Sequence, residues 1–233
     1  MTAYELTNKD PSLKIAVIGP TDQKGGASQA SGAMLGCFGE ITDQTFFNDQ
    51  AEKRFMMAFD AHKRWPSVIE NLNSLVPKSQ QQEIDQGTFV VLNPCSGQIE
   101  SDSFRELLAT LKRLNEPYEE IDPRVIEGFN PNENLRPLRS IVIPNEGSLD
   151  SRRFMSVLWS LLEQRGVQFV EQKALGFYQE GKGFVVDLDN SETVTSSKCL
   201  LAAGAFTQNL LDAHPDLADR IPHLFPGWFF RIH

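Results

Sequence analysis

The clearest fold signals in the sequence are LKIAVIGP at residues 13–20 and KGGASQASGAMLGCFGEIT at residues 24–42. The first part is an apolar run bounded by Pro11 and Gly19-Pro20, which predicts a strand buried on both faces, as in parallel α/β sheets. Ten of the nineteen residues in the second part are Gly, Ala or Ser, yet Met34 and Phe38 make it more apolar than a flexible linker. The small residues either let a ligand approach the backbone or let a helix and strand pack tightly, and spacing alone favours neither.

Bulk composition limits the class of protein. The 233 residues correspond to one large domain or two small ones. The net charge is −9 and no Lys/Arg cluster is dense, so we expect no nucleic-acid partner. The polar N-terminus is not that of a signal peptide, and no apolar run approaches the length of a membrane-spanning helix, so we expect no membrane span.

The cysteines indicate the compartment. Cys37, Cys95 and Cys199 are odd in number, far apart and form no CxxC, so neither a disulfide framework nor a zinc site is indicated. This usage fits a protein of the reducing cytoplasm.

Helical patterns alternate with strand patterns along the chain. Helices are predicted over residues 47–75, broken or kinked at Pro66, and over residues 101–115, opened by Ser or Asp caps. Strands are predicted at residues 87–94 and 139–144.

The second half continues this alternation. Asp150 is predicted to be the N-cap of a helix whose C′ residue is Gly166, and strands and a short helix follow. The order predicts an α/β, Rossmann-like layer interrupted by an inserted α+β region.

A second small-residue turn occurs in KCLLAAGAFTQNLL at residues 198–211, where an apolar strand is expected to end in Ala-Ala-Gly and turn into a helix. Ligands of open α/β sheets bind outside the carboxyl ends of strands, so this turn is a candidate cofactor crevice. A tight strand–helix turn without a ligand is the alternative.

Several catalytic signatures are absent from the sequence: the GxxxxGK[ST] phosphate loop, the GxSxG elbow and HExxH. The histidines are scattered, and each is expected to be structural or to face solvent: His62, His214, His223 and His233. No metal site is expected.

Four stretches together resemble the D-amino acid oxidase/glycine oxidase (DAO) family of FAD-dependent oxidoreductases. They are KIAVIGP, GGASQASGAML, PNEGSLDSRRFMSVLWSLLEQRGVQFVEQ and LLAAGAFTQNLL, and their order and spacing also match the family. The resemblance runs through nearly the whole chain. It implies an incomplete FAD-binding Rossmann-like layer, with flavin segments at about 1–46 and 145–213, and an inserted α+β substrate domain at about 47–144 and 214–233.

The resemblance also implies a cofactor and a reaction. FAD would accept a hydride from the amine-bearing carbon of an amino acid or secondary amine, and the resulting imine would hydrolyse. The positions that match the family's FAD-contacting segments are Ala27, Ser28, Gly32, Ala33, Met34, Leu35, Leu175, Ala203 and Gly204.

The sequence departs from the family pattern at three places. It contains no GxGxxG, and its first ten residues resemble the helix that follows that turn, so roughly 25–30 residues of the first βα unit are expected to be missing. Gly19-Pro20 stands where the family usually has an acidic residue for the ribose. The usual substrate-binding Arg and Tyr would lie beyond FFRIH at the end, so no catalytic residue is assigned.

The prediction is therefore a fragment or subunit of an FAD-dependent amine or amino-acid oxidoreductase, with a second chain as a candidate supplier of the missing parts. Two alternatives remain at this point. One is a non-catalytic remnant or interaction module that reuses the fold without FAD, and the other is an α/β protein that binds a different small ligand.

Overall fold

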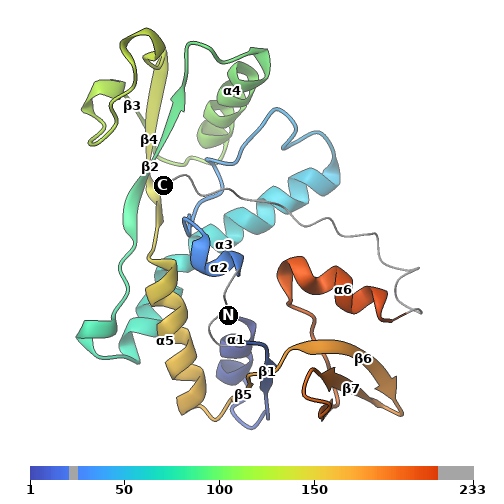
Figure 1. Cartoon of the computed structure of the whole chain (residues 1–233). Helices are drawn as coiled ribbons and strands as arrows, with labels where there is room; N and C mark the ends of the chain where they lie inside the picture. Colours follow the sequence, from blue (N-terminus) through green and yellow to red (C-terminus); the bar gives the residue numbers. More distant parts are fainter. Residues whose placement is uncertain (21–25, 215–233) are drawn as a thin grey trace. The chain divides into compact units, whose positions relative to one another are not determined.

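The computed structural model describes residues 1–20 and 26–214. The described residues form two compact units, and each is described by itself: unit 1 comprises the chain before Ser31 and after Val157, and unit 2 is Ser31–Val157. The elements in chain order are α1 (Thr2–Lys9), β1 (Ala16–Ile18), α2 (Ala27–Ala30), α3 (Asp49–Ser74), η1 (Lys78–Gln80), β2 (Asp85–Leu92), α4 (Gln98–Arg113), β3 (Glu119–Ile121), η2 (Pro123–Val125), η3 (Glu133–Leu135), β4 (Arg139–Ser148), α5 (Ser151–Gln164), β5 (Gln168–Val170), β6 (Ala174–Glu180), β7 (Gly183–Leu188), β8 (Thr193–Ser196), η4 (Gly204–Phe206) and α6 (Thr207–Asp212) (Figure 1).

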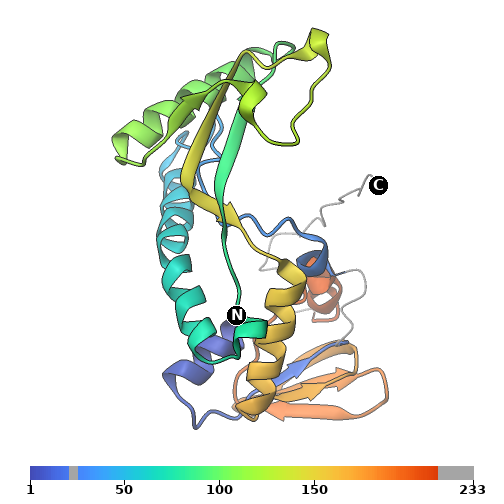
Figure 2. The same ribbon diagram turned by 90° about the vertical axis from the view of Figure 1, so that its left-hand side faces the viewer.

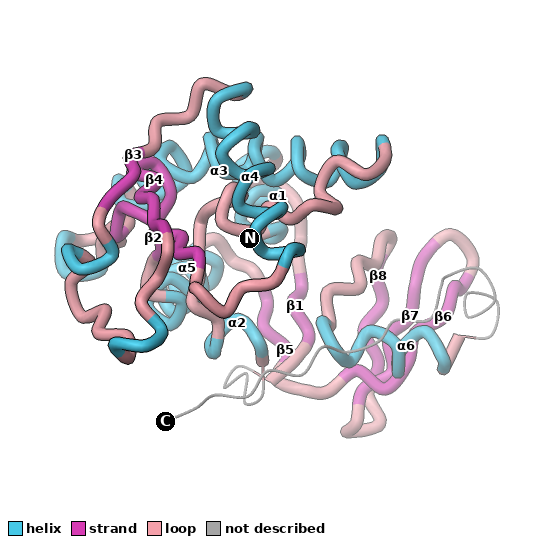
Figure 3. The backbone as a smooth tube through the Cα atoms, turned by 90° about the horizontal axis from the view of Figure 1, so that it is seen from above, coloured by secondary structure: helices cyan, strands magenta, loops and turns pink. Residues whose placement is uncertain are grey.

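Unit 1 contains a parallel pair and an antiparallel sheet. β1 pairs with β5, with Val17 opposite Phe169, and β6–β7–β8 form an antiparallel meander on which α6 packs at β6 (Figure 3). Phe177, Val186 and Leu210 are buried between the meander and this helix. The mixture of parallel and antiparallel sheets confirms the predicted α/β class.

Two strand predictions in unit 1 need correction. The strand predicted at 13–19 is limited to Ala16–Ile18 and is exposed or half-buried rather than buried on both faces. The apolar strand expected before Ala203 is absent from the described residues, because β8 ends at Ser196 and residues 197–203 are irregular. A single partner strand gives β1 too little cover to be fully buried.

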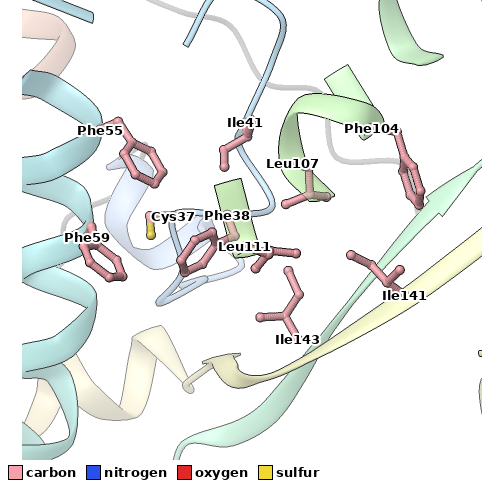
Figure 4. Close-up of a cluster of buried hydrophobic side chains, with 10 residues drawn as sticks. All are labelled: Cys37, Phe38, Ile41, Phe55, Phe59, Phe104, Leu107, Leu111, Ile141 and Ile143. Atoms are coloured by element: carbon pink, nitrogen blue, oxygen red, sulfur yellow. The ribbon is translucent and has the colours of Figure 1, made fainter. Parts of the chain in front are cut away.

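Unit 2 is built on the antiparallel sheet β2–β4–β3, in which β4 is central. Figure 2 shows β2 and β4 as a long, bent pair of strands beside α4. Phe38 is completely buried at the centre of the core, with Phe55 and Phe59 from α3 on one side and Leu111 from α4 on the other (Figure 4).

Two helices of unit 2 differ from the prediction. α3 runs unbroken through Pro66, so of the predicted break or kink at this residue the break is wrong. Buried residues lie on both sides of the proline, Phe59 before it and Leu72 after it, and their burial offsets the lost backbone hydrogen bond. α4 begins at Gln98, and its N-cap is Gly97 without a side-chain cap, so the expected Ser or Asp caps are not used.

β4 also extends beyond the predicted end at residue 144. Thr88 lies opposite Ile143, but Gln86 lies opposite Gly147, so Pro144 falls within a bulge of β4. A proline is tolerated there because the bulge needs no ladder hydrogen bond from its nitrogen. The strand therefore continues to Ser148 and includes Glu146.

Candidate functional site

The small-residue segment joins the end of β4. Met34 forms a β-bridge with Ser148, the amide of Leu35 donates to the carbonyl oxygen of Gly147 at 2.7 Å, and the amide of Leu149 donates to Ala33 at 3.3 Å. Through an isolated β-bridge and these two bonds, residues 33–35 are attached to β4. This part of the small-residue run is therefore packed structure and not a flexible linker.

Exposure changes sharply along this segment. Gly32 is exposed, with no atom within 4 Å of the position that a Cβ would take, and Met34 is 57% exposed. Leu35 is 8% exposed. Ala33 between them has a φ of 43°, a left-handed conformation that non-glycine residues rarely adopt. The segment thus presents Gly32–Met34 outward and turns into the core at Leu35.

Glu146 holds the inward turn. Its side chain is 1% exposed, and its Oε1 accepts hydrogen bonds from the amides of Cys37 at 2.5 Å and Phe38 at 2.6 Å. His62, from α3, places Nδ1 3.0 Å from the carbonyl oxygen of Leu35. A carbonyl oxygen only accepts, so this contact requires the proton on Nδ1.

The thiol beside this carboxylate is inert. Burial, followed by the negative charges of Glu146 and Glu116, raises the pKa of Cys37 from 9.0 to about 12, against a smaller opposing effect of Lys63. Cys37 therefore remains a neutral thiol at physiological pH, which argues against a nucleophilic or redox role.

The remaining predicted positions lie in unit 1. Ala27 and Ser28 are exposed in α2, and Leu175 is 55% exposed at a β-bulge, between the pairs Ala174–Leu188 and Gly176–Asp187. Bulges interrupt the hydrogen-bond ladder and often lie beside functional sites.

The other predicted positions of unit 1 lie in the turn at residues 203–204. Gly204 has a φ of 56° and no atom within 4 Å of its Cβ position, and Ala203 precedes it as the N-cap of η4. Ala203 and Ala174 pack against the same hydrophobic cluster of unit 1. Unit 1 thus brings the Leu175 bulge and the Ala203 turn onto one core, and Gly32, Ala33, Met34 and Leu35 form a continuous segment of unit 2.

Glu146 and His62 are the residues of this region that sequence reasoning missed as site residues. Glu146 lies beyond Pro144, where the predicted strand at residues 139–144 ends, so the sequence pattern does not place it in the sheet. For His62 the sequence predicts a structural or solvent-facing position, and the structural alternative is correct because the side chain is buried. Its helical spacing with Phe55 and Phe59 is the available signal for burial. Of the other histidines, His223 and His233 lie outside the described residues, and the ring of His214 lies tilted against the ring of Phe177.

Metal clusters and membrane-spanning helices are both absent from the described residues. No cluster of three or more His, Cys, Asp or Glu side chains there could hold a metal ion. Within the same residues, no helix combines the length and the apolar character needed to cross a membrane.

Comparison with protein families decides the classification. The family described as "DAO: FAD dependent oxidoreductase" matches residues 1–231. The chain belongs to the DAO family. The predicted family is confirmed, and the cofactor of DAO proteins is FAD. No curated protein is significantly similar in sequence.

Solved structures show the same DAO-like fold. Glycine oxidase from Geobacillus kaustophilus superposes with a TM-score of 0.71 at 17% identity, over 91% of this chain and 54% of that chain. Iminodiacetate oxidase from Chelativorans sp. BNC1 gives a TM-score of 0.65 at 13% identity, over 91% and 54% of the two chains. L-amino acid deaminase from Proteus vulgaris gives 0.64 at 14% identity, over 89% and 45%. The DAO chain described here thus spans about half the length of these structures.

Two of the predicted FAD positions of this DAO chain, Gly32 in unit 2 and Gly204 in unit 1, leave open space where a Cβ would lie. Such space is compatible with a flat ring that comes close to the backbone. None of the nine predicted positions carries a charged side chain, so polar contacts to the cofactor there would come from the backbone and from the hydroxyl of Ser28.

Proposed function

We propose that this chain is the flavin-contacting part of an FAD-dependent oxidoreductase that oxidises the C–N bond of an amino acid or secondary amine. The observation that carries the proposal is the outward-facing Gly32–Met34 segment, fixed to β4 in a chain that matches the DAO family over residues 1–231. When bound, FAD would supply the redox chemistry by accepting a hydride from the amine-bearing carbon. The protein residues would position the flavin ring and exclude water from its face.

The similar structures support the substrate class. Their names describe a glycine oxidase, an iminodiacetate oxidase and an L-amino acid deaminase, so amino acids and secondary amines recur among the substrates of this fold. We extend this class, and no single substrate, to the present chain.

We assign the flavin domain to about 1–46 and 145–213, and the substrate domain to about 47–144 and 214–233. Most of the last segment lies outside the described residues. The nine predicted FAD positions all fall within the two flavin segments, which supports this division.

A second chain is proposed to complete the enzyme. β1 pairs only with β5 among the described residues, through bonds such as that from the amide of Gly19 to Val170 at 3.0 Å. Because alternate residues of a parallel strand face opposite edges, Ala16 and Ile18 have their backbone groups directed away from β5. An open edge of this kind accepts a further strand.

All three cysteines are free thiols, which supports the cytoplasm as the compartment.

The decisive test is flavin binding by the purified chain. FAD should produce bands near roughly 375 and 450 nm that remain with the protein through gel filtration, as for bound oxidised flavin. Gly32→Leu would fill the open space beside the segment and should abolish retention. Ala61→Leu is the matched control, because it adds a side chain of the same size at an exposed position of α3.

Absence of retained flavin at high FAD would overturn the proposal for this chain alone and favour the non-catalytic remnant. Equal retention by Gly32→Leu and wild type would overturn the placement of the flavin. Addition of the remaining part of a DAO protein as a second chain then tests whether binding and amine oxidation need that partner.

A further inference from the structure

We propose that Glu146 is a positioning residue that anchors the turn at residues 36–38 and thereby fixes the outward segment Gly32–Met34. The effect of this anchor on flavin binding rests on the function proposed above. The anchor itself is a property of the chain without any cofactor.

The first argument is that Glu146 fills an anion site made by the backbone. Successive amides that point the same way form a concave anion-binding nest, and the amides of Cys37 and Phe38 converge on Oε1 of Glu146. The carboxylate of the chain itself therefore takes the place that a phosphate or another external anion would occupy. We infer that this part of the small-residue run serves structure and that its contact with a ligand begins further upstream.

The second argument is the burial of the carboxylate. Glu146 is 1% exposed, and its Oε2 has no hydrogen-bond partner among the described residues. A charge this deeply buried depends on the donors that it has, so the carboxylate and the two amides stabilise one another. Because those donors belong to the turn, movement of the turn would leave a buried charge without hydrogen bonds.

The third argument is continuity along the backbone. Between Ala33 and Phe38, Glu146 holds two amides, Gly147 holds the amide of Leu35, and His62 contacts the carbonyl oxygen of Leu35. Glu146 makes the only side-chain contacts to amides of this stretch that link it to β4 within the described residues. Its loss should release the turn first and then the unusual backbone of Ala33.

Amide hydrogen exchange followed by NMR tests the anchor without flavin. Glu146→Ala should speed exchange of the Leu35, Cys37 and Phe38 amides by about tenfold to a hundredfold more than its effect on global unfolding explains, as expected for the loss of two charge-assisted bonds. Glu146→Gln keeps the size and one acceptor oxygen, so it should restore most of the protection. Glu120→Gln is the matched control, because Glu120 is exposed and pairs with Arg139.

If Glu146→Ala speeds amide exchange at residues 33–38 only as much as its lower global stability explains, the proposed anchor is overturned. If Glu146→Ala does not fold, the test uses Glu146→Gln alone. Amides of the turn that exchange in this variant as fast as in the chemically unfolded chain would overturn the anchor, and slower exchange would support it. FAD titration separates this inference from the proposed function. Failure of the wild-type chain to bind FAD contradicts the proposed function alone. If hydrogen exchange shows that Glu146→Ala releases the turn and this variant still binds FAD with wild-type affinity, the positioning role is contradicted.

Discussion

The carboxylate of Glu146 lies against the α-carbon of Gly36. A Cβ built on Gly36 would be 2.4 Å from Cδ of Glu146, closer than real contacts allow. The glycine at this position is therefore required by a side chain of the same protein. At Gly32, four residues earlier, the corresponding space is open. The packing explanation of the small-residue run therefore applies at Gly36, and the space at Gly32 remains open for the ligand proposed above.

Gly36→Ala should destabilise the protein by about 1–3 kcal/mol, the usual range for overpacking a core. In the Glu146→Ala background the added methyl group has room, so the same substitution should cost less. Urea denaturation of the two single variants and the double variant gives the coupling free energy. Additive effects would show that the glycine is not required by the carboxylate.

Thr88→Val should leave the free energy of unfolding unchanged or raise it. The Thr88 hydroxyl is buried and has no hydrogen-bond partner among the described residues, and valine has nearly the same shape without the polar group. Urea denaturation measures the change, with Thr110→Val as control because its buried hydroxyl contacts Glu106 at 3.3 Å. If Thr88→Val lowers the free energy of unfolding by more than about 1 kcal/mol, the Thr88 hydroxyl makes a stabilising hydrogen bond, and the prediction is wrong.

The free energy of unfolding should fall as the pH rises above 9, because the thiol of Cys37 is harder to ionise in the folded protein than in the unfolded chain. Burial raises its pKa in the folded protein from 9.0 to about 12, so between these values the unfolded chain loses the thiol proton while the folded chain keeps it. The unfolded state then binds fewer protons, and linkage requires stability to fall as the pH rises. Below pH 9 the thiol is neutral in both states and has no such effect.

The measurement is the free energy of unfolding of wild type and Cys37→Ala from pH 8 to 11. The wild type should lose stability more steeply than the variant, because both share every other titrating group. Iodoacetamide should label the exposed Cys95 of the native protein much faster than Cys37. Parallel stability curves would contradict the raised pKa.

Local signals predicted much of the fold. Asp150 accepts hydrogen bonds from the amides of Arg152 and Arg153 at 3.0 Å, and Gly166 has a φ of 76°, so both ends of α5 were predicted correctly. These features depend on residues only a few positions apart, which is why the sequence reveals them. The family resemblance added the cofactor, which no spacing argument could supply.

The anchor could not be predicted in the same way. Glu146 contacts Cys37 across 109 positions of sequence, and nothing local at either residue indicates the other. Pro144 is a local stop signal, yet the bulge opposite Gln86 and Thr88 lets β4 continue past it. The continuity of α3 through Pro66 has the same origin, because packing of buried side chains outweighs a local preference.

His62→Leu should lower the free energy of unfolding by about 1–3 kcal/mol, because it leaves the buried carbonyl oxygen of Leu35 without its hydrogen-bond donor. His62→Asn places an amide N–H near the position of Nδ1 and should recover part of this loss, although it is smaller and packs less well against Phe38. Urea denaturation measures both variants, and ¹⁵N NMR of the histidine ring identifies the protonated nitrogen. A neutral ring with its proton on Nε2, or equal costs for the two substitutions, would show that this contact does not hold Leu35. The turn would then depend on β4 and Glu146 alone.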